Sequence, residues 1–298
     1  MRPSLRVLAG VLLTLPAGAT PLHSQRQVPQ AAIRTTPDHP ARGAVAWITI
    51  VPTDPLDTIL GAAGEAAGEP LHFTRHANGT LHGLVGIPLA GDDCLSVSLR
   101  LDRPTGVDTL TVGLAVRRPA YPSERLRVAP RYAEPDSAAQ ARVARELAQS
   151  RAISREAHGT PRLWTDAFHP PRPGRVTSRY GTARTFNGRV MSRHLGTDYA
   201  GVVGAPVRAA NRGVVALIAD FYLAGHAVYL DHGAGLVTGY FHLSGVTVAP
   251  GDTVAAGQQI GAVGQSGRAT GPHLHWIARY GEITVDPVSL FSLGPPPE

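Results

Sequence analysis

Residues 273–280 read HLHWIARY, and this stretch constrains the fold more than any other in the chain. Apolar Leu274 and Trp276 alternate here with His273 and His275. Side chains at positions i and i+2 of a β-strand lie on the same face, so this alternation is typical of a strand packed on one face only. We therefore expect a strand that buries the apolar pair and presents the two histidines side by side on its other face.

Short segments of the same kind fill the C-terminal half. Glycine and proline, with 33 and 26 residues of 298, interrupt the chain often, which favours short strands and turns over long helices. Further strands are expected at residues 213–219, 227–231, 237–243 and 259–263. The pattern predicts one antiparallel β domain over residues 163–298.

The N-terminal half has a comparable texture. Its expected strands lie at residues 44–51, 71–73, 81–87, 94–101 and 109–116. Regularly spaced short strands between Gly, Asp and Pro indicate an immunoglobulin-like β-sandwich over residues 43–132. We find no catalytic constellation in this half, and we interpret His72, His76 and His82 as solvent-facing strand residues.

The one strong helix signal lies between these halves. Residues 136–156 are rich in Ala and other good helix formers, and Asp136 supplies capping chemistry at the start. We expect a helical connector over residues 133–162. The predicted fold class is mainly β: an N-terminal sandwich, this connector and a C-terminal antiparallel domain.

The start of the chain predicts export. Residues 1–19 have a basic beginning, an apolar run at 7–15 and an A-x-A cleavage signal at 17–19, which together indicate a signal peptide. The polar, proline-containing residues 20–42 are expected to form a flexible leader. The mature protein is then expected in the periplasm or elsewhere in the cell envelope, with an extracellular location as the alternative, and with no stable membrane span after cleavage. Retention of the signal segment as an anchor stays open.

The charge and the cysteine content bear on two questions: the class of partner and the presence of disulfides. The net charge is +6, and all 28 basic residues are arginine. These arginines are scattered and form no basic patch with interleaved aromatics, so we expect no nucleic-acid partner. The single cysteine, Cys94, excludes an intrachain disulfide and is expected to be a small buried side chain beside an alternating run.

Two further segments carry candidate metal chemistry. HLGTD at 194–198 contains His194 and Asp198, and YFHLS at 240–244 contains His242. Strand alternation places His242 on the same face as Tyr240. Zinc binds imidazole nitrogen and carboxylate oxygen, and catalytic zinc sites keep three protein ligands and a water. The segments supply four imidazoles and one carboxylate, so a single zinc site would leave two histidines for acid–base work.

Residues 175–290 resemble the lysostaphin/LytM-type zinc endopeptidases of bacterial cell walls. The matching motifs are HLGTDYA at 194–200, YFHLS at 240–244 and TGPHLHW at 270–276. Shorter segments at 206–207, 213–215, 231–233 and 250–252 also fit in order. The resemblance is specific because ligand motifs and glycine positions match in one register.

The resemblance implies a role for each histidine. The implied ligands of one zinc ion are His194, Asp198 and His275. The implied catalytic histidines are His242 and His273. The residues that we expect to line the substrate cleft are Tyr240, Arg184 and Asn187, with ordinary loop or packing roles as the alternative. In one departure, Ile277 stands where such proteins commonly carry an acid.

These observations predict an exported zinc metallopeptidase that hydrolyses cross-links or stem peptides in peptidoglycan. Two alternatives stay open: a non-catalytic relative that binds the wall or activates an amidase, and a secreted protease acting on glycine-rich proteins. The N-terminal sandwich and helix resemble, more weakly, the accessory domains that precede such peptidases. Their role could be to shield the cleft or to dock a partner, and protein partners are unknown.

Overall fold

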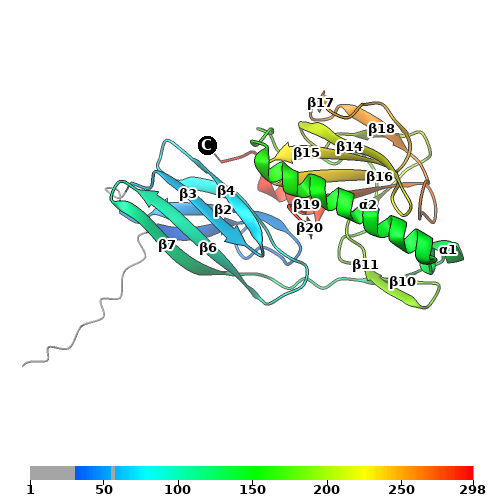
Figure 1. The fold of residues 1–298 in the computed structure, drawn as a ribbon, viewed down its shortest axis with the longest axis horizontal. Coiled ribbons are helices and arrows are strands. Elements are labelled where there is room, and N and C mark those ends of the chain that lie inside the picture. Colours follow the sequence, from blue (N-terminus) through cyan, green and yellow to red (C-terminus); the bar gives the residue numbers. More distant parts are fainter. Residues whose placement is uncertain (1–30, 55–57, 298) are drawn as a thin grey trace, which may run out of the picture.

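The computed structural model describes residues 31–54 and 58–297. The predicted signal peptide at residues 1–19 lies outside this part of the chain. The described residues form two β-rich lobes with one long helix beside the C-terminal lobe (Figure 1). The prediction of a mainly β protein with antiparallel sheets is confirmed. No helix of the described residues has the length and apolar character needed to cross a membrane.

The N-terminal lobe is a seven-stranded antiparallel path in the order β1-β2-β5-β4-β3-β6-β7. The strands are β1 (Ala31–Thr36), β2 (Val45–Pro52), β3 (Gly61–Ala66), β4 (Glu69–Arg75), β5 (Leu81–Gly86), β6 (Cys94–Arg103) and β7 (Gly106–Ala115). Strand β1 corrects part of the expected flexible leader. Ala31 is buried, Ile33 packs against the core, and the strand pairs along its length with β2.

Strand β6 shows why the expectation for Cys94 was wrong. The inward positions of this strand are Val97, Leu99 and Leu101, and all three are buried. Cys94 lies in the opposite phase, the one shared with Ser96, and is exposed. The alternation of the strand decides burial here, whatever the preference of cysteine for protein interiors.

The segment between the lobes contains β8 (Ser123–Leu126), α1 (Pro130–Ala133), α2 (Ser137–Glu156) and the 3₁₀ turn η1 (Ala157–Gly159). Helix α2 occurs where the sequence predicts it, and the Asp136 side chain caps it by accepting a hydrogen bond from the Ala139 amide at 2.8 Å. Ile153 of α2 packs in a cluster with Tyr229, Phe241 and Ile277. The helix therefore lies against the C-terminal sheet (Figure 1).

The C-terminal lobe is built on a ten-stranded antiparallel sheet whose main path is β17-β14-β15-β16-β19-β12-β9. Its strands are β9 (Val176–Ser178), β12 (Thr197–Ala200), β13 (Pro206–Arg208), β14 (Gly213–Phe221), β15 (Gly225–Gly233), β16 (Leu236–Val246), β17 (Thr253–Val254), β18 (Gln259–Val263), β19 (His273–Tyr280) and β20 (Ile283–Val285). A small sheet joins β10 (Ala183–Phe186) to β11 (Val190–Arg193) and, in parallel, to β8. The chain ends in the 3₁₀ helix η2 (Pro287–Leu293).

Direct contacts join the two lobes. The Trp47 indole donates a hydrogen bond to the Leu293 carbonyl at 2.9 Å, and the Tyr280 hydroxyl donates to the Pro70 carbonyl at 2.7 Å. A second link, which we call the interlobe chain, runs from Glu69 through His158 to His72. His158 Nε2 lies 3.0 Å from Glu69 Oε2, and His158 Nδ1 lies 2.8 Å from His72 Nε2. His72 is thus not the solvent-facing residue that the sequence suggested.

Candidate metal centre and substrate groove

Three ligand-type atoms converge at the edge between β12 and β19. The two strands are antiparallel neighbours that place Asp198 opposite His275, and His194 lies just before β12. His194 Nε2 is 3.0 Å from Asp198 Oδ1 and 2.9 Å from His275 Nδ1, and the last two atoms are 2.7 Å apart. The residues predicted to bind zinc therefore lie together, with one donor atom of each facing a common point.

Gly196 makes this convergence possible. A Cβ atom at this position would lie 2.6 Å from the His275 ring, 2.6 Å from the Trp276 carbonyl oxygen and 2.8 Å from Ile277. Any larger residue would push β12 away from β19. The glycine between His194 and Asp198 is thus needed for close strand packing, and not for an unusual backbone angle.

The electrostatics favour a divalent cation. Burial by itself would raise the pKa of Asp198, but hydrogen bonds from His194 and His275 hold that pKa well below its usual range. Burial lowers the pKa of His275 to about 4, despite the opposing effect of Asp198. At neutral pH Asp198 is therefore a carboxylate and His275 a neutral imidazole, and His194 adds a second ring nitrogen. Such donors suit zinc, and in residues 31–54 and 58–297 these are the one group of three His, Cys, Asp or Glu whose ligand atoms lie close enough to share an ion.

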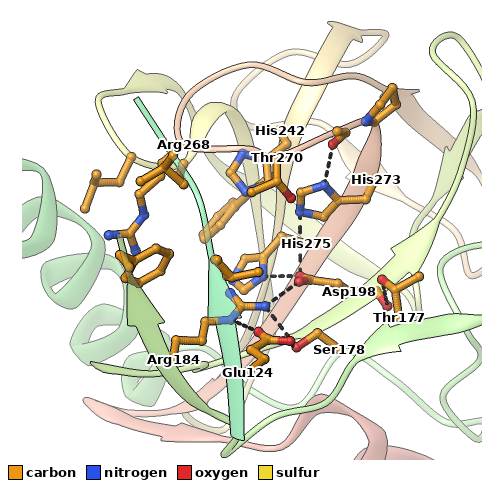
Figure 2. Close-up of a pocket in the computed structure, with 18 of the residues that line it drawn as sticks. Glu124, Thr177, Ser178, Arg184, Asp198, His242, Arg268, Thr270, His273 and His275 are labelled. Carbon is orange, nitrogen blue, oxygen red and sulfur yellow. Dashed lines mark hydrogen bonds and ion pairs between the residues drawn. The ribbon is translucent and has the colours of Figure 1, made fainter. Parts of the chain in front are cut away.

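Arg184 and Glu124 hold the carboxylate from behind. Arg184 Nη2 donates to Asp198 Oδ2 at 2.7 Å and to Ser178 Oγ at 2.9 Å, and its Nε forms an ion pair with Glu124 (Figure 2). Arg184 lines the groove, as expected of a cleft residue, but its guanidinium is engaged with Asp198. Glu124 belongs to β8, so the segment between the lobes contributes directly to this site.

The two remaining histidines share one tautomer. His242 Nδ1 lies 2.7 Å from the Ser266 carbonyl oxygen, and His273 Nδ1 lies 2.7 Å from the Gly271 carbonyl oxygen. A carbonyl only accepts, so each Nδ1 carries a proton, and the lone pair of the neutral ring is at Nε2. Burial, and then the neighbouring His275 and His273, lower the pKa of His242 to about 3, which keeps it neutral. The two rings are 4.8 Å apart between centroids.

The side chains of β19 lie on the faces of the strand that the sequence predicts, but those of β16 do not. Phe241, not Tyr240, stands opposite His275 in the register, and its ring lies 5.5 Å from that of His275. Tyr240 is fully buried and donates no group to the groove; its hydroxyl accepts a hydrogen bond from the Ala210 amide. His242 still reaches the site because its φ of 60° breaks the strand alternation. The assignment of Tyr240 to the substrate cleft is therefore wrong.

Asn187 is also misplaced by the sequence-based prediction. Its side-chain amide donates to the Val128 carbonyl at 2.9 Å, and its side-chain oxygen accepts from the Val128 amide at 3.0 Å. Asn187 thus ties the turn after β10 to the segment that follows β8. It acts as a local brace of the groove wall, and it does not line the groove.

The groove around this centre has a volume of about 430 Å³. One wall is the segment between the lobes, with Glu124, Leu126 and Val128. Arg268 lies on the groove with its guanidinium carbon 4.4 Å from the centre of the Phe186 ring, and Figure 2 shows it across from the histidines. Sequence reasoning missed Glu124 and Arg268, because nothing in their local pattern distinguishes them from the other scattered charges.

Comparisons with known proteins agree with this geometry. The model of Peptidase family M23 matches residues 192–287. Peptidoglycan DD-endopeptidase ShyA of Vibrio cholerae is 45% identical over 109 residues, which are 37% of this chain and 23% of ShyA. The matched segment therefore spans about a quarter of that relative's length.

Two solved structures are similar. A Pseudomonas aeruginosa structure assigned to peptidase M23 is 27% identical, with a TM-score of 0.64 over 85% of this chain and 95% of that chain. The catalytic domain of lysostaphin from Staphylococcus simulans is 30% identical over 40% of this chain and 92% of that domain, with a TM-score of 0.37. Residues 192–287 of the C-terminal lobe are thus a Peptidase family M23 domain.

Proposed function

We propose that this protein is an exported zinc metalloendopeptidase that hydrolyses peptide bonds in bacterial peptidoglycan. The observation that carries the proposal is the convergence of His194, Asp198 and His275 at the floor of a groove that two further histidines face. The name of the relative ShyA, a peptidoglycan DD-endopeptidase, supports the substrate class. The division into residues 43–132, 133–162 and 163–298 is part of the same proposal, with the start of the first part moved back to β1.

The donor set fits zinc, with His194 Nε2, Asp198 Oδ1 and His275 Nδ1 as ligand atoms. The bound metal would supply an acidified water and polarise the scissile carbonyl. His194 is oriented by its Nδ1–H, which faces the Arg179 carbonyl at 3.0 Å. Arg184 is a positioning residue, because it fixes Asp198 Oδ2 and leaves Oδ1 for the metal. This support replaces any that an acid at Ile277 would give.

His242 and His273 would handle the protons. Each has Nδ1–H bound to a carbonyl and Nε2 free, so each is ready to accept a proton at Nε2 and pass it to the departing amine. His273 Nε2 lies 3.8 Å from Asp198 Oδ1, which places it beside the ligand atoms. The sequence and the geometry leave both histidines as candidates for the general base.

The location and the peptide partner follow from this function. Peptidoglycan lies outside the cytoplasm, so the proposal requires export to the periplasm or cell envelope. The free cation of Arg268 on the groove fits a substrate that carries carboxylates. The histidines beside the metal centre favour a catalytic role over a wall-binding one, because a binding module does not need acid–base groups there.

The test is a digest of purified peptidoglycan by the mature protein, followed by mass spectrometry of the released muropeptides. Wild type should release new peptide-bond products, and both a chelated sample and His275→Ala should release none. Products that persist in the His275→Ala sample would contradict the proposal. If zinc binds and wild type releases no product, the wall-binding or amidase-activating alternative is favoured. Faster cleavage of glycine-rich protein than of peptidoglycan would favour the general protease.

A further inference from the structure

A second pocket lies on the same face of β19, beyond the metal centre. It has a volume of about 180 Å³ and lies between α2 and the sheet. Val143 and Leu147 of α2 form one side, and Tyr229 and Ile277 form the other. We call it the β19 side pocket. It shares His275, Phe241, Leu223 and Ala224 with the substrate groove, so the two spaces adjoin.

Arg279 gives this apolar pocket an unpaired positive charge. The residue is only 7% exposed, and its Nε and Nη1 have no hydrogen-bond partner among the described residues. Arg279 follows Ile277 on the same face of β19, four residues from His275. At about 3.3 Å per residue, the Cα atom of Arg279 lies roughly 13 Å along the strand from that of His275.

The nearby carboxylates are already engaged. Glu146 lines the pocket but binds Arg142 and the Tyr222 amide. Glu282 forms an ion pair with Arg155. The Ser150 hydroxyl, buried on α2 and close to Tyr229, makes no hydrogen bond of normal geometry. The pocket therefore offers apolar walls and two kinds of hydrogen-bond donor, and it lacks a matching anion.

A buried guanidinium without a partner is costly, and the cost is recovered when a carboxylate binds it. We propose that the β19 side pocket is a substrate subsite that binds an aliphatic, carboxylate-bearing part of the peptide, with Arg279 as the anchor. This inference rests on the proposed peptidase function. The distance along β19 corresponds to a carboxylate three or four backbone positions from the scissile amide in an extended peptide.

The experiment compares two synthetic cross-linked peptides that differ only in whether the stem carboxylates are free or amidated. Wild type should cleave the free acid with a kcat/KM about 10-fold to 100-fold higher, the range expected for a charge-assisted hydrogen bond. Arg279→Gln should bring this ratio close to one, mainly by raising KM for the free acid. Arg279→Lys should keep part of the preference, because it keeps the charge.

Arg145→Gln is the matched control, since Arg145 is exposed on α2, does not line the pocket and changes the net charge equally. It should leave the ratio as in wild type. Arg279→Met should have a melting temperature equal to or above that of wild type, because it removes an unpaired buried charge. A large fall in melting temperature would assign Arg279 a structural role instead.

The outcomes separate the two levels of the proposal. Equal cleavage of both peptides by wild type, or a preference that survives in Arg279→Gln, would overturn the subsite. Failure of zinc-loaded wild type to cleave either peptide would overturn the peptidase function itself.

Discussion

Two buried clusters of histidine and carboxylate lie among the described residues, and they differ in shape. His194, Asp198 and His275 meet at one point, with all three ligand atoms within 3.0 Å of one another. The interlobe chain of Glu69, His158 and His72 is linear, because His158 uses its two ring nitrogens for two different neighbours. A metal needs donors that face a common centre, whereas the interlobe chain fastens His158 of η1 to two residues of β4. Residue type alone would not separate a ligand set from a link between lobes.

The converging cluster and the interlobe chain should differ most in metal binding. Asp198→Ala or His275→Ala removes one of three converging donors, so zinc should fall from about one per chain to near zero, and hydrolysis should fall by at least about 10³-fold. His158→Ala, the matched change in the interlobe chain, should keep the zinc. Elemental analysis of the purified proteins measures this. Zinc lost from His158→Ala but kept in Asp198→Ala would reverse the assignment of the two clusters.

Within the converging cluster, ligands and proton carriers should separate. His242→Ala and His273→Ala should keep zinc, because neither side chain supplies one of the three converging donor atoms. Turnover should fall by about 10²-fold to 10⁴-fold, the usual loss for a positioned acid–base group. Zinc content and kcat measured on the same preparations test this. A variant with full turnover would remove that histidine from the mechanism.

The support behind Asp198 should give a smaller effect. Arg184→Gln leaves Oδ2 of the ligand without its ion pair, so zinc affinity should fall by about 10-fold to 100-fold. Competition with a chelator dye measures the affinity, and the visible spectrum of the cobalt-substituted protein reports ligand geometry. Glu124→Gln should shift both in the same direction. Arg125→Gln, an exposed neighbour in β8, is the control and should shift neither.

The linear cluster should matter for stability instead. His158→Ala removes the hydrogen-bond partner of Glu69 Oε2 and of His72 Nε2, which should cost about 1–3 kcal/mol in the free energy of unfolding. Urea denaturation of the apoprotein measures it. A destabilisation no greater than that of an exposed variant such as His226→Gln would show that the chain does not hold the lobes together.

The smallest expected effect is a pH dependence of the same link. Burial, and then neighbouring His158, lower the pKa of His72 below 6.5. A lowered histidine pKa means that the unfolded chain binds the proton more readily, so stability is full above about pH 6.5 and falls as the pH drops below it. Between pH 7.5 and 5.5 the apoprotein should lose more stability than His72→Gln does. If the free energies of unfolding of the two proteins changed in parallel with pH, this role for His72 would be contradicted.

Sequence patterns predicted β19 well and β16 poorly, for a physical reason. In β19 the two-residue alternation runs without interruption, so the histidines and the core residues fall on the expected faces. In β16 the φ of 60° at His242 breaks the alternation. The prediction counted the two faces of the strand from His242, so it put Tyr240 on the groove face, where Phe241 lies instead. A single backbone angle of this kind leaves no trace in the order of apolar and polar residues.

Local sequence patterns also could not predict the groove wall or the residues that support the metal ligands. Glu124 reaches the site because β8 pairs in parallel with β10, about sixty residues later in the chain. Such pairing depends on how the two lobes pack, and the sequence around Glu124 resembles an ordinary charged linker. By contrast, His194 and Asp198 were identified because their segment, HLGTDYA, resembles a motif of the lysostaphin/LytM-type endopeptidases. The glycine between them permits the close packing of β12 on β19.

The central claim is that the converging cluster, and not the linear one, is the metal centre of a peptidase. The most direct test is an anomalous X-ray difference map from zinc-loaded crystals, recorded on both sides of the zinc absorption edge. The account predicts one peak, bound by His194 Nε2, Asp198 Oδ1 and His275 Nδ1 at about 2.0–2.2 Å. A peak at Glu69, His158 and His72, or no peak between the three predicted ligands, would contradict it.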